Sequence, residues 1–270
     1  MSQNSYDNAM AFLASQLASM ASLESKSDLV IGIDFGTTFT GVAFAHTGNA
    51  AGSDILKIAE NLEVIRSWPN PSFQYAGKTP TIISYNTDPP TWGGNVKPRD
   101  EPQVSHFKLR LQPSVSDHYR TSNATSVLAF LDPNFKNPVP KKTAVDFAAD
   151  YLTCVHRYVK EVAFPRQFGE SFLRGQQISY VITVPAIWKD SAKALTRQAA
   201  QRAGIPQHKL ELITEPEAAA LYCATICREV DLQNGDRFLV CDAGGGTVVS
   251  LVKKYLLIYI VGSHFILGHF

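Results

Sequence analysis

The sequence predicts an α/β protein, because short apolar runs typical of β-strands alternate with segments of helical character. Residues 178–184 form one such apolar run and predict a strand. Residues 190–203 predict a helix that Asp190 caps and that ends before Gly204. Residues 210–213 form a second short strand. Strand, helix and strand in succession are typical of an α/β domain.

Two further helices are expected on either side of this unit. Apolar side chains recur at three- and four-residue spacing at Ala144, Phe147, Tyr151, Val155, Tyr158 and Val162. This helix should stop before Pro165, because proline lacks a backbone N–H. The other helix opens at Glu215, with Pro216 in its first turn, where a missing N–H is tolerated. Residues 238–241 then return to strand.

The bulk composition excludes several classes of partner. The chain has 270 residues, 45% of them apolar and 18% charged, which is enough for a sizeable core. Its net charge is +1 and it has no long Lys/Arg run, so we expect neither nucleic acid nor a membrane surface as a partner. Scattered cysteines without zinc-site spacing indicate reduced thiols and a cytoplasmic location. They are Cys154, Cys223, Cys227 and Cys241.

Three segments stand apart in composition. Residues 1–27 are rich in Ser, Ala, Met and Asn and lack the basic start of a secretory signal, so we expect a flexible leader. Residues 46–112 mix short strand-like runs with Pro, Gly and Asn, which predicts a small inserted α/β subdomain. Residues 249–270 are apolar, but Gly and His interrupt them, and a spanning helix needs about 20 apolar residues. We therefore expect no membrane anchor there.

Two short segments, residues 31–40 and 239–248, place an aspartate, glycines and threonines between apolar runs. Glycine can adopt positive φ and lets backbone N–H groups approach a phosphate oxygen, while threonine hydroxyls add donors. The candidate phosphate-binding residues are Gly36, Thr37, Thr38, Gly244, Gly245, Gly246 and Thr247. Asp34 and Asp242 supply hard oxygens for a Mg²⁺ that keeps several waters. One copy could be an ordinary hairpin turn, but two copies indicate a nucleotide phosphate site.

The order of these motifs resembles the nucleotide-binding domain of the seventy-kilodalton heat-shock chaperones, within the actin-like ATPase superfamily. The resemblance covers about residues 28–248 and rests on four segments: Asp34–Thr38, Val181–Ala186, Thr214–Ala220 and Asp242–Thr247. It implies the actin-like, ribonuclease H-like fold, with the first lobe and the start of the second. It also implies ATP or ADP and Mg²⁺ as cofactors, and client proteins or co-chaperones as partners. Trp188 and the loop region before Lys108 are more similar to a divergent branch that lacks the usual peptide-binding domain.

The resemblance also assigns catalytic roles. Lys108, in the run 106–111, is similar to the family's catalytic lysine and would position the water that attacks the γ-phosphate. Glu215 would order Mg²⁺ water or accept a proton. Each residue has an alternative interpretation. Lys108 and Arg110 could form the solvated face of a strand-like run, and Glu215 could merely interact with the helix dipole, an effect of about 0.3–1 kcal/mol.

The chain departs from the family pattern at and beyond the second turn. The family usually carries a second aspartate just after this turn, where this chain has Val249. The family's domain continues with a second outer subdomain and an adenosine-binding loop, whereas this sequence ends at Phe270. We expect residues 249–270 to be an aberrant tail, from a changed reading frame or an unspliced intron. We also expect ATP binding by this truncated chain to be weakened.

Three functions agree with these patterns. The first is a chaperone-like ATPase of the heat-shock 70 type. The second is a sugar or acetate kinase, because such kinases share both phosphate hairpins and the fold, and fold alone does not separate the two. The third is a non-catalytic nucleotide-sensing or interaction module, which Val249 favours. Residues 214–220 favour the chaperone over the kinase.

Overall fold

The structure is a computed structural model that describes residues 28–47, 62–70, 77–112, 138–226, 238–243, 248–253, 258–261 and 264–267. The expected leader, residues 1–27, lies outside this range. Among the described residues, no helix combines the length and the apolar character needed to cross a membrane.

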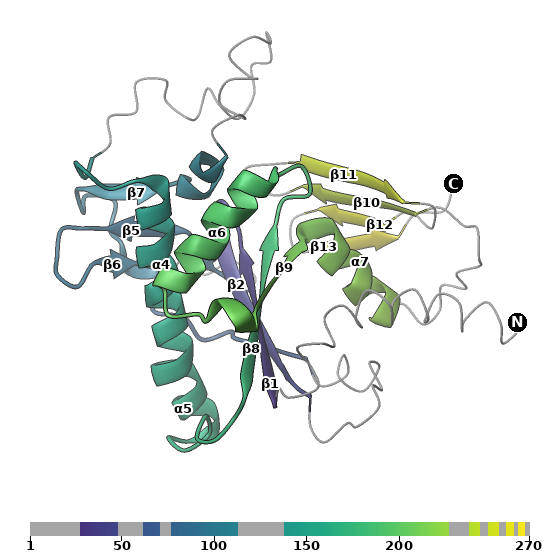
Figure 1. The fold of residues 1–270 in the computed structure, drawn as a ribbon, viewed down its shortest axis with the longest axis horizontal. Helices are drawn as coiled ribbons and strands as arrows, with labels where there is room; N and C mark the ends of the chain where they lie inside the picture. The colour runs from purple at the N-terminus through teal and green to yellow at the C-terminus, as the bar shows by residue number, and fades with distance from the viewer. Residues whose placement is uncertain are drawn as a thin grey trace, which may run out of the picture.

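A mixed six-stranded sheet forms the centre of the fold (Figure 1). Its strands are β1 (Leu29–Phe35), β2 (Phe39–His46), β3 (Glu63–Val64), β4 (Thr79–Pro80), β8 (Ile178–Val184) and β9 (Leu210–Thr214). β1 forms an antiparallel hairpin with β2 and pairs in parallel with β8, which pairs in parallel with β9. The strands expected at residues 178–184 and 210–213 are confirmed.

Helices connect the strands and cover the sheet. The long helices are α4 (Ala144–Tyr158), α6 (Asp190–Arg202) and α7 (Glu215–Ile226), and a short 3₁₀ turn, η5 (Gln207–Lys209), precedes β9. α4 and α6 pack against each other over one face of the sheet (Figure 1). α6 is the crossover between the parallel strands β8 and β9. The predicted α/β class is confirmed.

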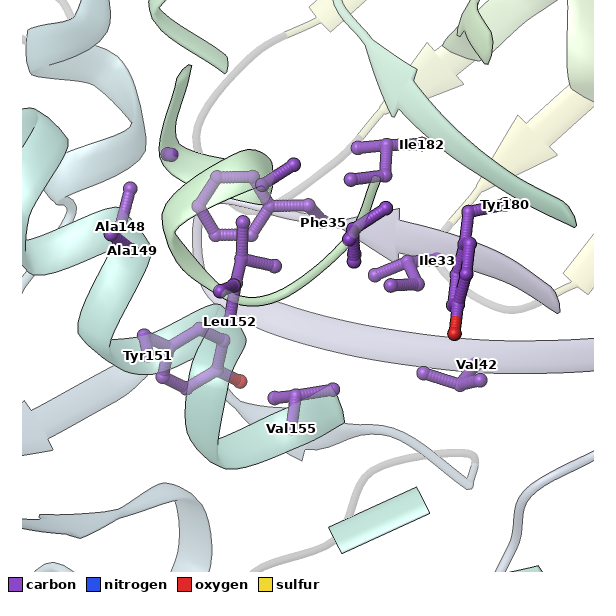
Figure 2. Packing of buried hydrophobic residues seen from close by; sticks show 14 of the residues in the cluster. Ile33, Phe35, Val42, Ala148, Ala149, Tyr151, Leu152, Val155, Tyr180 and Ile182 are labelled. Atoms are coloured by element: carbon purple, nitrogen blue, oxygen red, sulfur yellow. The ribbon is translucent and has the colours of Figure 1, made fainter. Parts of the chain in front are cut away.

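The hydrophobic core lies between β1, β8 and α4. Along β1 buried and half-buried side chains alternate, as expected for a strand with one face turned to the core. Figure 2 shows Phe35 beside Leu152 and Tyr151 of α4, and the Phe35 and Tyr151 rings stack with centroids 6.2 Å apart. Burying a side chain such as Phe35 contributes about 1.5–3 kcal/mol. This packing fixes the end of β1, where Asp34 lies.

The helix starts differ in how they are capped. Thr143 caps α4: its hydroxyl accepts the Asp146 N–H, and the Asp146 carboxylate accepts the Thr143 N–H. The expected cap of α6 at Asp190 is wrong, because Lys189 is the N-cap residue and its side chain makes no capping bond. Asp190 lies in the first turn, where its charge still suits the helix dipole. The end of α6 before Gly204, which has a φ of +85°, is confirmed.

The helical chain continues past Pro165, so the expected stop before this residue is wrong. α4 runs into a π-helical turn, η4 (Val159–Ala163), and then into α5 (Phe164–Phe168). Pro165 lies just after this π-helical turn. The π-helical turn interrupts the regular i to i−4 hydrogen bonds of the helical chain, which accommodates a residue without a backbone N–H.

A small antiparallel sheet lies beside α4, made of β5 (Ile82–Ser84), β6 (Thr91–Trp92) and β7 (Gln103–Ser105). The 3₁₀ turn η2 (Gly93–Asn95) follows β6. The strand-like conformation expected for residues 106–111 is wrong, because a 3₁₀ helix, η3 (Phe107–Leu111), follows β7. His106, with a φ of +56°, turns the chain between them. The subdomain boundaries at residues 46 and 112 stay a prediction.

A third sheet contains the second glycine-containing hairpin. Its strands are β10 (Phe238–Ala243), β11 (Val248–Lys253), β12 (Ile258–Val261) and β13 (His264–Leu267), in the order β11-β10-β12-β13 (Figure 1). Parts of residues 249–270 therefore pair with β10, β11 being antiparallel and β12 parallel to it. The interpretation of these residues as an aberrant tail stays a prediction.

Candidate functional site

The first turn joins β1 to β2 and needs glycine at position 36. The Gly36 N–H donates to the Asp34 carbonyl at 3.0 Å. A Cβ added to Gly36 would lie 2.1 Å from the Phe39 carbonyl oxygen, so a larger residue does not fit. The expectation of positive φ at Gly36 is wrong, because its φ lies outside the left-handed region. Close approach of backbone to backbone, rather than φ, requires the glycine.

The two threonines after this glycine lie in a turn that long-range hydrogen bonds hold in place. Thr37 is buried and Thr38 is half-buried. The Thr81 N–H donates to the Thr38 carbonyl at 2.8 Å, and the hydroxyls of Thr40 and Thr81 lie 2.8 Å apart. These bonds hold the turn to Thr81, between β4 and β5, so its conformation is preformed.

The Asp34 carboxylate is held by two side chains from distant parts of the sequence. Thr183 of β8 donates its hydroxyl to Oδ1 at 3.0 Å, and the Lys78 ammonium donates to Oδ2 at 2.6 Å. Desolvation by burial raises the pKa of Asp34, but the Lys78 ammonium and, more weakly, Lys108 and the Thr183 hydroxyl outweigh it and leave the pKa below its usual value. Asp34 is therefore an ionised carboxylate at the turn.

Lys78 is a residue that the sequence interpretation missed. Because Thr40 of β2 pairs with Thr79 of β4, Lys78 is brought beside the first turn although it is 44 positions from Asp34. Its side chain crosses Gly41, where an added Cβ would lie 3.3 Å from Lys78 Cγ. Its place at the start of the strand-like run 78–85 was only a weak signal.

Lys108 and Glu215 form a buried ion pair. Lys108 lies on η3 and Glu215 at the start of α7, and Nζ lies 2.5 Å from Oε1. The side chains are only 2% and 13% exposed. The interpretation of Lys108 as part of a solvated face is therefore wrong.

Two aromatic rings enclose the Lys108 ammonium. Its Nζ lies 5.7 Å from the centroid of the Phe35 ring and 5.7 Å from that of Trp188. Cation–π attraction at such distances adds about 0.5–2 kcal/mol and fixes the position of the charge. Phe35 directly follows Asp34, so the packing of β1 joins the lysine to the first turn.

Glu215 is distinct from the carboxylate that caps α7. Thr214 and Glu217 form reciprocal bonds: the Thr214 hydroxyl donates to Glu217 Oε2 at 2.6 Å and accepts the Glu217 N–H at 3.4 Å. Glu217 thus serves the helix start, while the Glu215 carboxylate binds Lys108. A helix-dipole role alone does not account for the position of Glu215.

The second turn is described only in part. Asp242 lies on β10 opposite Val249 of β11. The remaining predicted residues of this turn, Gly244, Gly245, Gly246 and Thr247, lie outside the described residues. The structure therefore brings together Asp34, Lys108 and Glu215, and the second turn of the expected nucleotide phosphate site stays a prediction.

The described residues offer few candidate side-chain ligands for Mg²⁺. They contain no group of three or more His, Cys, Asp and Glu side chains that could enclose a metal ion. Mg²⁺ bound to a nucleotide needs only one or two carboxylates, often through water, since phosphate oxygens supply other ligands. The ionised Asp34 carboxylate beside the first turn fits this outer-sphere role.

Comparisons with known proteins identify the family. A sequence model described as Hsp70 protein matches residues 164–254, which run from α5 to the end of β11. Heat shock 70 kDa protein 12A of Homo sapiens is 33% identical over 211 residues, covering 72% of this chain and 28% of the relative. The chain belongs to the Hsp70 family. The resemblance inferred from the motifs is confirmed.

Other relatives extend the similarity of this Hsp70-family protein. Chaperone protein dnaK of Gracilaria tenuistipitata var. liui is 29% identical, covering 81% of this chain and 31% of the relative. Chaperone protein HscA homolog of Neisseria meningitidis is 28% identical, and the match covers 96% of this chain and 38% of the relative. The chain thus spans between 28% and 38% of the length of these relatives.

Proposed function

We propose that this Hsp70-family protein binds ATP and ADP with Mg²⁺ and hydrolyses ATP as a chaperone-like ATPase with the actin-like, ribonuclease H-like fold. The observation that carries the proposal is the convergence of three elements. β1 supplies Asp34 and the phosphate turn, η3 supplies Lys108, and α7 supplies Glu215. These are the groups that phosphoryl transfer requires, namely fixed cations, carboxylates and backbone donors.

In this proposal Lys108 and Glu215 act as one unit. The ion pair and the rings of Phe35 and Trp188 hold the ammonium in a fixed position, where it orients the attacking water and faces the charge of the γ-phosphate. Glu215 keeps the ammonium in place and accepts a hydrogen bond from it. Mg²⁺, held through water by Asp34 and Asp242, would neutralise the phosphate oxygens.

Replacing Lys108 with Met tests the catalytic assignment. We expect kcat for ATP hydrolysis to fall about 100-fold or more, because a preorganised charge is lost, while ATP affinity changes less. Single-turnover hydrolysis and isothermal titration calorimetry measure the two effects. Lys193→Met is the matched control, because Lys193 lies on α6 and makes only a long 3.8 Å ion pair with Asp190.

The opposite result has a clear meaning. Equal turnover in Lys108→Met and the unchanged protein would contradict the catalytic role. Absence of any ATP or ADP binding in the unchanged protein would contradict the proposed function as a whole. The weakened ATP binding expected for this chain stays a prediction. The same calorimetric titration of the unchanged protein measures it.

A second candidate is a non-catalytic nucleotide-sensing module. The pairing of Asp242 with Val249 favours it, because an apolar residue takes the place where the family pattern has a second aspartate. Nucleotide binding without turnover is its expected signature. Hsp70 family membership argues against the remaining candidate, a sugar or acetate kinase.

Client proteins and co-chaperones are the partners that belong to this proposal, and the cytoplasm is the proposed location. Neither nucleic acid nor a membrane is proposed as a partner, in keeping with the net charge of +1. ATP-dependent capture of an unfolded model protein by the full chain tests the chaperone part.

A further inference from the structure

Lys78 is a second lysine at the first phosphate turn, and the proposed reaction does not use it. Its Nζ lies 2.6 Å from Asp34 Oδ2, the same carboxylate that would face Mg²⁺. The β2–β4 pairing anchors its backbone, and its stem crosses the open position above Gly41. Lys78 is thus directed at the carboxylate by the fold and is not a randomly placed surface lysine.

The two lysines of the site differ in their freedom to move. The side chains of Lys78 and Asp34 are 40% and 41% exposed, whereas those of Lys108 and Glu215 are 2% and 13% exposed. Exposed ion pairs are weak and lysine has a flexible stem, so an incoming anion can draw the Lys78 ammonium away. Lys108, enclosed by two rings and a carboxylate, stays in place.

We propose that Lys78 is a phosphate-binding residue that partly substitutes for Mg²⁺, so that this protein binds nucleoside di- and triphosphates even without a divalent cation. This inference rests on the proposed nucleotide-binding function. Without Mg²⁺, the Lys78 ammonium moves from Asp34 to the phosphate oxygens and neutralises part of their charge. With Mg²⁺, cation and ammonium compete for the Asp34 carboxylate, because both carry positive charge.

The test compares ADP and ATP affinity with Mg²⁺ and with EDTA, using the 270-residue chain and isothermal titration calorimetry. In EDTA we expect Lys78→Met to weaken binding about tenfold or more, the effect of one charge-assisted hydrogen bond. With Mg²⁺ we expect a change of less than about threefold, since the cation supplies the missing charge. Lys78→Arg, which keeps the charge, should retain most of the affinity in EDTA.

A second readout follows the competition for Asp34. The Mg²⁺ concentration that gives half of the maximal gain in ADP affinity should be lower in Lys78→Met, because no ammonium then occupies the carboxylate. This titration measures cation dependence and not catalytic activity. An unchanged half-maximal Mg²⁺ concentration would count against the proposed competition.

Lys142→Met is the matched control. Lys142 makes a comparable ion pair with Asp150 at 2.5 Å, with side chains 34% and 32% exposed, but it lies before α4 and away from the turn. We expect the nucleotide affinity of Lys142→Met to equal that of the unchanged protein, both with Mg²⁺ and in EDTA. Equal losses in both variants would overturn the proposal, because a change in net charge would then explain them. Circular dichroism checks that each variant is folded.

The outcomes separate the two proposals. If the unchanged protein binds no nucleotide even with Mg²⁺, both fail. If it binds nucleotide but Lys78→Met matches it in EDTA, only the role of Lys78 is overturned. If Lys78→Met loses as much nucleotide affinity with Mg²⁺ as in EDTA, the proposal that Lys78 takes the place of Mg²⁺ is also overturned.

Discussion

Gly36 fixes the conformation of the turn between β1 and β2, and its role is testable. Gly36→Ala should destabilise the protein by about 1–3 kcal/mol, because the new methyl group would lie against the Phe39 carbonyl oxygen and the backbone must shift. Gly32→Ala on β1, the strand that leads into the turn, is the control, since its nearest neighbour would lie at an ordinary 3.8 Å. Urea denaturation measures both variants. Equal stability of the two would contradict the steric account.

Individual site residues were predictable to different degrees. The sequence placed Asp34, Gly36 and the threonines at a turn because turn chemistry is local, and their binding of phosphate or Mg²⁺ stays a prediction. Lys108 was found only through the family resemblance, and its burial could not be foreseen from a run that looked strand-like. Lys78 was missed because its position beside Asp34 depends on the pairing of β2 with β4, which no local sequence pattern predicts.

At the scale of elements, the start of α4 depends on one capping box. Thr143→Ala removes the hydroxyl that accepts the Asp146 N–H and should destabilise the protein by about 0.5–2 kcal/mol. Lys189→Ala is the control at the start of α6, where the side chain makes no capping bond, and should change stability by less than about 0.5 kcal/mol. Thermal or urea denaturation measures the difference. An equal effect at the two helices would contradict the assigned cap.

Most helices and strands were predictable because hydrophobic periodicity and turn residues act locally. The errors fall where two local preferences compete. Pro165 signals a helix end, but a π-helical turn just before it lets the helical chain continue into α5. Residues 107–111 alternate like a strand, but the turn at His106 leads into a 3₁₀ helix that buries Lys108.

At the scale of the molecule, His156 joins three elements and makes stability depend on pH. From α4, its Nδ1–H donates to the Ala203 carbonyl at 3.0 Å, and its Nε2 accepts the Tyr180 hydroxyl of β8 at 2.9 Å in the neutral tautomer. Burial lowers the pKa of His156. The folded state therefore favours the neutral ring, and the unfolded state, with a pKa of about 6.5, takes up the proton first.

The sign of the resulting pH dependence follows directly. The contribution of His156 is present above pH of about 6.5 and is lost as the pH falls through the folded pKa. We expect the free energy of unfolding to decrease between pH 7.5 and pH 5, and to decrease less in His156→Gln, which lacks the titrating ring. His208→Gln, at an exposed position, is the control. An unchanged slope in His156→Gln would contradict this role.

The sequence alone determined the family, the α/β class and the glycine-containing hairpin between β1 and β2, because these depend on residue order, periodicity and backbone chemistry over short stretches. Only the tertiary structure decided which side chains meet. Glu215 lies 107 positions from Lys108, and Lys78 lies 44 positions from Asp34. Their contacts depend on how β1, β2, β4 and β8 pair and how α7 leaves β9, and such long-range pairing is selected by packing of the whole core.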